Sequence, residues 1–122
     1  MAISEAEFQE QVIQFAKLHG WRVAHFRKVR VQRANGSVYW ETPVAADGKG
    51  FLDLELVKDR LVKAELKVGH NKMTIEQEGW INAYWNAGIE AYVWFPKDWT
   101  QIEHILGGHA DGEASNLQRP AR

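Results

Sequence analysis

The sequence predicts an α/β protein with a mixed central β-sheet flanked by helices. Two observations indicate this class: apolar residues recur with helical spacing in two stretches, and several short apolar runs are bounded by turn residues. The 122 residues fit a single domain. We expect that domain to cover residues 1–106 and residues 107–122 to form a flexible C-terminal tail, because this end is rich in Gly, Ala, Asp, Ser and Asn.

The first element expected is an amphipathic helix over residues 4–19. Ser4 can cap its N-terminus, and a glutamate three positions later can complete a capping box. At about 100° per residue, Glu5 and Gln9 lie at the edge of the apolar face, whereas Glu10 points to the opposite side. Glu5 is therefore expected to face a cleft on the core side, and Glu10 to face water.

The elements that follow are mainly strands. One strand is expected from Trp21 to Val31, and Asn35-Gly36 predicts a type I′ hairpin turn between residues 29–33 and 38–41. This extra β-hairpin near residues 29–41 is followed by a Gly-rich loop over 42–50. The remaining two strands, helix, strand and short helix are expected at 51–57, 61–68, 74–86, 89–95 and 98–106.

Composition excludes some classes of protein and leaves others open. The chain has no cysteine, so it has neither a disulfide framework nor a thiolate metal site. Its first residues do not resemble a secretory signal, and no apolar run approaches the roughly 18 residues that cross a membrane. We therefore expect a cytoplasmic protein with no membrane partner. The net charge of −1 neither favours nor excludes a nucleic acid partner.

The strongest chemical signal is a pair of acidic motifs, Gly-Phe-Leu-Asp at 50–53 and Glu-Leu-Lys at 65–67. If residues 58–60 form the turn of a hairpin, Asp53 lies opposite Glu65 with Cβ atoms about 4.5–5.5 Å apart. A two-residue turn would instead place Asp53 opposite Leu66, and the two carboxylates would not be paired. An exposed strand face with alternating charges is the alternative explanation of the same pattern.

A divalent cation would reconcile two carboxylates that lie this close together. Asp53, Glu65 and the Leu66 backbone carbonyl offer hard oxygen ligands that suit Mg²⁺, which would keep several waters. Side chains alternate along a strand, so Lys67 shares the face of Glu65 and could orient or deprotonate a metal-bound water. This is the arrangement that a metal-dependent phosphodiesterase needs, although the pattern by itself favours the exposed strand face.

Together with Lys-Met-Thr-Ile-Glu-Gln at 72–77, these motifs resemble the VRR-NUC family of the PD-(D/E)XK nuclease superfamily, in its stand-alone phage and bacterial form. The likeness runs from Glu5 to about Leu106. It implies a restriction-endonuclease-like core and a Mg²⁺- or Mn²⁺-dependent DNA endonuclease, with branched, junction or flap DNA as the leading substrate. The catalytic residues it implies are Asp53, Glu65, Lys67, Gln77 and Glu5, of which Glu5 is also a metal ligand.

The chain departs from the family pattern at two places. Leu52 stands where the family usually has a proline, which should cost rigidity rather than chemistry. The hairpin and loop over residues 29–50 look like added length between the first strand and the metal-binding strand, which leaves the substrate more open.

The residues expected to contact DNA are mainly basic. Five basic residues of the chain fall from Arg22 to Arg33 with no acidic residue among them, although a solvated strand face would have the same composition. A lone histidine on a strand is more often structural, and a basic loop residue is often only solvated. The residues assigned to DNA contact are Lys72, Arg27, Arg30, Arg33, His25 and Gln9.

The partners expected beyond DNA depend on size and on tryptophan content. A nuclease this small covers little DNA, so a homodimer is plausible. Most of the six tryptophans are expected in the core or at a dimer face, whereas Trp40 could stack on bases. Two other functions stay open: a DNA-binding module on the same fold that does not cut, and an interaction protein that uses its Trp-rich half.

Overall fold

The computed structural model describes residues 2–108 and confirms an α/β fold with a mixed sheet. The sheet has four strands in the order β1-β4-β5-β6, and a separate two-stranded hairpin pairs β2 with β3. Only β5 and β6 run parallel, and the other neighbours are antiparallel. The elements are α1 (Glu5–Leu18), β1 (Arg22–His25), β2 (Val29–Gln32), β3 (Val38–Glu41), β4 (Leu54–Val57), β5 (Leu61–Leu66), α2 (Ile75–Asn86), β6 (Glu90–Trp94), the 3-10 helix η1 (Pro96–Asp98) and α3 (Trp99–Leu106).

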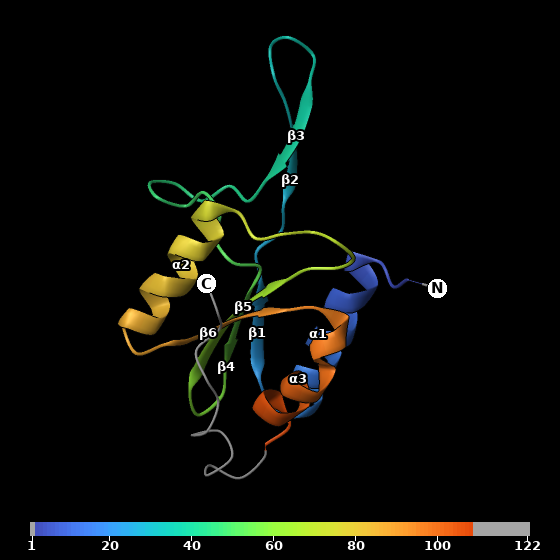
Figure 1. Ribbon diagram of the computed structural model, residues 1–122, viewed down its shortest axis with the longest axis vertical. Coiled ribbons are helices and arrows are strands. Elements are labelled where there is room, and N and C mark those ends of the chain that lie inside the picture. The colour runs from blue at the N-terminus through green and yellow to red at the C-terminus, as the bar shows by residue number, and fades with distance from the viewer. Residues whose placement is uncertain (1, 109–122) are drawn as a thin grey trace.

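Helices cover both faces of the sheet. In Figure 1, α1 and α3 lie on one side of the sheet and α2 lies on the other. The larger apolar core lies under α1 and α3 and includes Phe8, Leu54 and Trp94, all fully buried. The smaller core lies under α2, where Ile81 packs near Leu52. The sheet is therefore the middle layer of three, so residues from helices on both sides can lie next to the end of the sheet that carries Asp53.

Both long helices begin where the sequence predicted, and each begins with a capping box. Ser4 accepts a hydrogen bond from the N–H of Glu7, and the Glu7 side chain accepts one from the N–H of Ser4. Thr74 and Gln77 make the same reciprocal pair at the start of α2. These bonds satisfy backbone donors that a helix start leaves without an intrahelical partner.

The register of the β4–β5 hairpin is the one that a turn over residues 58–60 requires. Val57 pairs with Leu61 and Leu54 pairs with Ala64, so the next position outward sets Asp53 opposite Glu65. β4 begins at Leu54 rather than at residue 51, which places Asp53 just before the strand. The shorter strand leaves the Asp53 backbone outside the ladder, at the end of the sheet.

The single strand expected from Trp21 to Val31 is wrong. The chain pairs with β4 only as far as His25, opposite Leu54, because β4 has no residues in the ladder before that position. After a last bond from the Phe26 N–H to the Asp53 carbonyl, at 2.7 Å, the chain leaves the sheet. It then forms the β2–β3 hairpin, which projects away from the three-layered body in Figure 1.

The type I′ turn expected at Asn35-Gly36 is also wrong. A type I′ turn needs positive φ at both central residues, and here Gly36 has φ +88° whereas Asn35 does not lie in the left-handed region. The loop instead contains three residues, closed by a bond from the Arg33 N–H to the Ser37 carbonyl. The Asn35 side chain accepts hydrogen bonds from the Ser37 N–H and hydroxyl, which holds the turn without left-handed strain at Asn35.

The C-terminal end of the described chain follows α3. Gly107 caps that helix, and the tail expected over 107–122 falls almost wholly outside the described residues. Between residues 2 and 108, none of the helices has the length and apolar character needed to cross a membrane.

Candidate functional site: a buried carboxylate pair beside an open pocket

Asp53 and Glu65 meet at the end of the sheet, as the predicted register requires. The Asp53 N–H donates to Glu65 Oε1 at 3.3 Å, and the Leu66 N–H donates to Asp53 Oδ2 at 3.1 Å. Asp53 is 2% exposed and Glu65 is fully buried. The interpretation of this pattern as an exposed, solvated strand face is therefore wrong for these residues.

Two further side chains hold the second oxygen of Glu65. Gln77 Nε2 donates to Glu65 Oε2 at 3.0 Å, and Lys67 Nζ lies 3.5 Å from the same oxygen. The other end of the Gln77 amide accepts from the Thr74 N–H in the capping box, so the helix start fixes which end of the amide faces Glu65. The predicted grouping of Asp53, Glu65, Lys67 and Gln77 is thus present, and we call these four residues the acidic cluster.

The electrostatics of the acidic cluster favour a proton or a cation at Glu65. Burial, followed by repulsion from Asp53, raises the pKa of Glu65 to about 8, although Lys67 and Lys28 act in the opposite direction. A carboxyl group with this pKa is mostly protonated at pH 7 when no cation is bound. A metal ligand must be deprotonated, so a divalent cation here would displace this proton.

A close approach at Gly50 brings the segment before Asp53 against the start of α2. Gly50 has φ +78°, and a Cβ atom on it would lie 2.5 Å from Glu76 Cβ and 2.8 Å from the Gln77 nitrogen. Only glycine fits this contact, because any side chain would be strained and would collide with the helix. The Gly-x-x-Asp motif therefore holds Asp53 and Gln77 in one arrangement.

An open pocket of about 420 Å³ lies beside Asp53. Glu5 and Gln9 line it from α1, as the helical wheel predicted, whereas Glu10 is exposed and accepts a hydrogen bond from Gln14. His25 lines it from the end of β1. The full lining is Glu5, Gln9, His25, Arg27, Lys28, Trp40 and Asp53.

The oxygen atoms suited to a divalent cation come from the acidic cluster and the strand that carries it. The Leu66 N–H donates to Asp53, and the N–H and C=O of one strand residue point to the same side, so the Leu66 carbonyl points toward the β4 side of β5, where Asp53 lies. Two carboxylates and a carbonyl, completed by waters, fit the ligand set of Mg²⁺. In the described part of the chain, no three His, Asp or Glu side chains form a metal-binding group, so Glu5 shares the pocket without completing such a group.

The remaining residues assigned to DNA lie outside this pocket. Arg30 and Arg33 are exposed on the projecting hairpin, and Lys72 is exposed in the loop before α2. The Arg33 guanidinium stacks over Tyr39, 4.0 Å from the ring centre. Of the six residues assigned, His25, Gln9 and Arg27 are brought to the pocket and the other three are not.

Two contributions to the site were not anticipated from the sequence. Lys28 belongs to the basic run but was not singled out, and it both lines the pocket and acts on Glu65. The sequence suggests Trp40 as a candidate for base stacking but does not indicate its place in the wall of the Asp53 pocket. Four other tryptophans donate their indole N–H groups to internal acceptors: Trp21, Trp80, Trp85 and Trp94.

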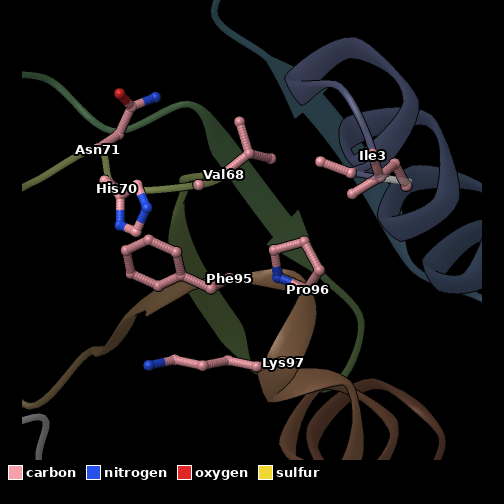
Figure 2. Close-up of a pocket in the computed structure, with 9 residues that line it drawn as sticks. Ile3, Val68, His70, Asn71, Phe95, Pro96 and Lys97 are labelled. Atoms are coloured by element: carbon pink, nitrogen blue, oxygen red, sulfur yellow. The ribbon is translucent and has the colours of Figure 1, made fainter.

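A second pocket, which no sequence motif indicated, lies at the carboxyl ends of β5 and β6. It has a volume of about 540 Å³. Figure 2 shows His70, Phe95 and Lys97 on one side of it and Ile3, from the segment before α1, on the other. Its walls are mostly apolar and it contains none of the acidic cluster, so it is a separate feature of the same end of the sheet.

Comparison with known proteins adds no relative to these observations. No protein-family model, no curated protein and no solved structure matches the chain. The functional argument therefore depends on the chain's own residues and their geometry.

Proposed function

We propose that this protein is a Mg²⁺- or Mn²⁺-dependent DNA endonuclease with a restriction-endonuclease-like core of the VRR-NUC type. The observation that carries the proposal is the buried Asp53–Glu65 pair, with Lys67 and Gln77 on one of its oxygens. A raised pKa at a buried carboxyl group beside an open pocket is a frequent mark of a functional site. A fold without such a function would gain nothing from two carboxylates held together out of water.

Each member of the acidic cluster has a distinct part in this mechanism. Asp53, Glu65 and the Leu66 carbonyl would hold the cation, and Glu5, which lines the same pocket as Asp53, would add a further carboxylate. The bound cation supplies charge that stabilises the phosphate and lowers the pKa of the attacking water. Lys67, whose Nζ lies 3.5 Å from Glu65, would orient the attacking water and would accept its proton or offset the developing negative charge. Gln77 keeps Glu65 in place and so positions the cation rather than the DNA.

The basic residues around the pocket bind the DNA backbone. Arg27, Lys28, His25 and Gln9 lie at the pocket itself, and Arg30, Arg33 and Lys72 extend the contact beyond it. An open pocket with a projecting hairpin suits branched, junction or flap DNA. We further propose that the enzyme acts in the cytoplasm and that a homodimer provides the second DNA-binding surface.

A cleavage assay tests the proposal. Purified protein is incubated with linear, flap and four-way-junction DNA in Mg²⁺, Mn²⁺ or EDTA. Cleavage is expected only with a divalent cation, and Asp53→Asn is expected to abolish it. Glu5→Gln is expected to slow cleavage, whereas Glu10→Gln on the exposed side of the same helix should not.

One observation favours a second candidate, a DNA-binding module that does not cut. Within residues 2–108 the acidic residues do not supply a three-carboxylate metal group. This candidate predicts DNA binding without cleavage under every metal condition. Cleavage that persists in EDTA or in Asp53→Asn would overturn the nuclease mechanism proposed here.

A further inference from the structure

One wall of the Asp53 pocket is an exposed tryptophan ring. Trp40 is 64% exposed, yet it lines the same pocket as Asp53, Glu5 and Arg27. It is carried by β3 of the projecting hairpin rather than by the three-layered body (Figure 1). This indole ring is largely in water and lines a charged pocket, so its face is available to stack on a ligand that enters the pocket.

The neighbours of Trp40 give this face of the hairpin a positive charge. Trp40 pairs with Arg30, and paired residues point to the same face, so the arginine lies beside the ring. The hairpin carboxylate, Glu41, pairs with Val29 on the opposite face. The Trp40 face thus combines an aromatic ring with a cation and, within the two strands, carries no acidic residue.

The base of the hairpin continues this arrangement into the pocket. Arg27 and Lys28 lie between β1 and β2 and line the pocket together with Trp40. Cations for phosphates next to an aromatic ring for a base are the combination that proteins use to bind single-stranded nucleic acids. A pocket of about 420 Å³ falls in the range of roughly 300–1,000 Å³ typical of small-ligand sites.

We propose that Trp40 stacks on an unpaired base next to the phosphate at Asp53, while Arg27, Lys28 and Arg30 bind the flanking phosphates. In an intact duplex the bases already stack on one another and present no free face to the ring. The protein therefore prefers DNA with a single-stranded segment or a branch point at the pocket. This inference deepens the proposed function, because it rests on the same pocket and names its substrate class.

Binding measured in EDTA tests the inference without any need for cleavage. The probes are a fluorescently labelled single-stranded oligonucleotide, a blunt duplex of the same sequence and a flap. Trp40→Ala should weaken binding of the single strand and the flap about 5- to 100-fold, the usual range for loss of one stacked base, and leave the blunt duplex unchanged. Trp40→Phe should retain most of the affinity, because a smaller ring still stacks.

The hairpin offers matched controls on its other face. Tyr39 pairs with Val31 and stacks with Arg33, so Tyr39→Leu and Arg33→Ala test the fold and general charge of the hairpin. Arg30→Ala should weaken single-strand binding more than Arg33→Ala does. Circular dichroism and thermal melting verify that each variant is folded.

The outcomes separate this inference from the nuclease proposal. Single-strand affinity in Trp40→Ala within twofold of wild type, or an equal loss on blunt duplex, overturns the stacking role even if metal-dependent cleavage is present. Conversely, a Trp40-dependent preference for single strands in a protein that never cleaves would retain the stacking role and remove the nuclease assignment.

Discussion

Two glutamate–lysine pairs lie on the same face of the β-sheet, and they differ in which of the two charged side chains is buried. Lys63 Nζ lies 3.5 Å from Glu55, and Lys67 Nζ lies 3.5 Å from Glu65. In the first pair the lysine is fully buried and the glutamate side chain is 43% exposed. In the second pair the glutamate is fully buried and the lysine side chain is 9% exposed.

The surroundings of each pair match the ion that is buried. Lys63 Nζ lies 4.3 Å from the ring centre of Phe51, 4.9 Å from Phe26 and 5.5 Å from Tyr84, so aromatic faces receive the cation. Burial still lowers the pKa of Lys63, although Glu55 opposes the shift. Glu65 instead meets a second carboxylate, Asp53, and the amide of Gln77.

The difference between the pairs separates a structural role from a chemical one. The positive charge of Lys63 is balanced by Glu55 and by the surrounding aromatic rings. Two of these rings, Phe26 and Phe51, belong to the segments next to Asp53. At the Glu65 pair, two carboxyl groups share one lysine close to an open pocket. Two glutamate–lysine pairs with the same 3.5 Å separation therefore differ in role, because the Lys63 pair supports the fold and the Glu65 pair suits a cation.

The largest expected effect comes from removing each lysine in turn. Lys67→Ala should lower the DNA cleavage rate about 10²- to 10⁴-fold, the usual contribution of a positioned acid–base group. Lys63→Met should leave the rate per folded molecule within a few-fold of wild type, because replacing a buried ion by an apolar side chain of similar size is often neutral or stabilising. Single-turnover rates with saturating Mg²⁺ measure both, and equal losses in the two variants would contradict the separation of roles.

The second effect is a pH dependence of stability that arises at Glu65. The native carboxyl has a pKa of about 8, whereas the unfolded reference is 4.5, so the native state binds more protons between these values. In EDTA the free energy of unfolding should therefore fall as the pH rises from about 5 to 9, by on the order of 4 kcal/mol. Urea denaturation at several pH values measures this slope.

Glu65→Gln isolates that slope, because every other titrating group is common to the two proteins. The variant keeps a neutral hydrogen-bonding side chain and should lose most of the fall in stability at high pH. Glu55→Gln, in the other pair, should retain it. Mg²⁺ should restore the stability of wild type at pH 9 but not that of Glu65→Gln, since a cation that binds only the native state stabilises it. A slope that survives in Glu65→Gln would assign the titration elsewhere.

Local signals in the sequence were enough for the helices and for the carboxylate pair. Both capping boxes depend on residues three apart, and the Asp53–Glu65 register depends on one three-residue turn. Each of these features depends on a few residues that are close in sequence, so the local residue pattern is enough to predict it.

Features that depend on contacts between distant segments could not be predicted in this way. The break after His25 occurs because β4 begins at Leu54, which the apolar pattern from residue 51 concealed. The burial of Lys63 depends on rings from three separate segments, and the position of Trp40 in the pocket wall depends on the direction in which the hairpin leaves the sheet. The spacing of residues along the chain indicates neither the burial of Lys63 nor the position of Trp40.

The smallest expected effect comes from removing the N-cap of each long helix. The two capping boxes have the same hydrogen bonds, but only one of them also contacts the acidic cluster. Ser4→Ala and Thr74→Ala should each lower the free energy of unfolding by about 1 kcal/mol, the usual cost of an N-cap. Only the Thr74 box contains Gln77, whose amide also donates to Glu65, so only Thr74→Ala should slow cleavage and shift the pH dependence of stability. Denaturation and cleavage measured on both variants give the comparison. If Ser4→Ala slowed cleavage as much as Thr74→Ala, Gln77 would be acting through general helix stability, and its hydrogen bond to Glu65 would have no separate part in positioning the site.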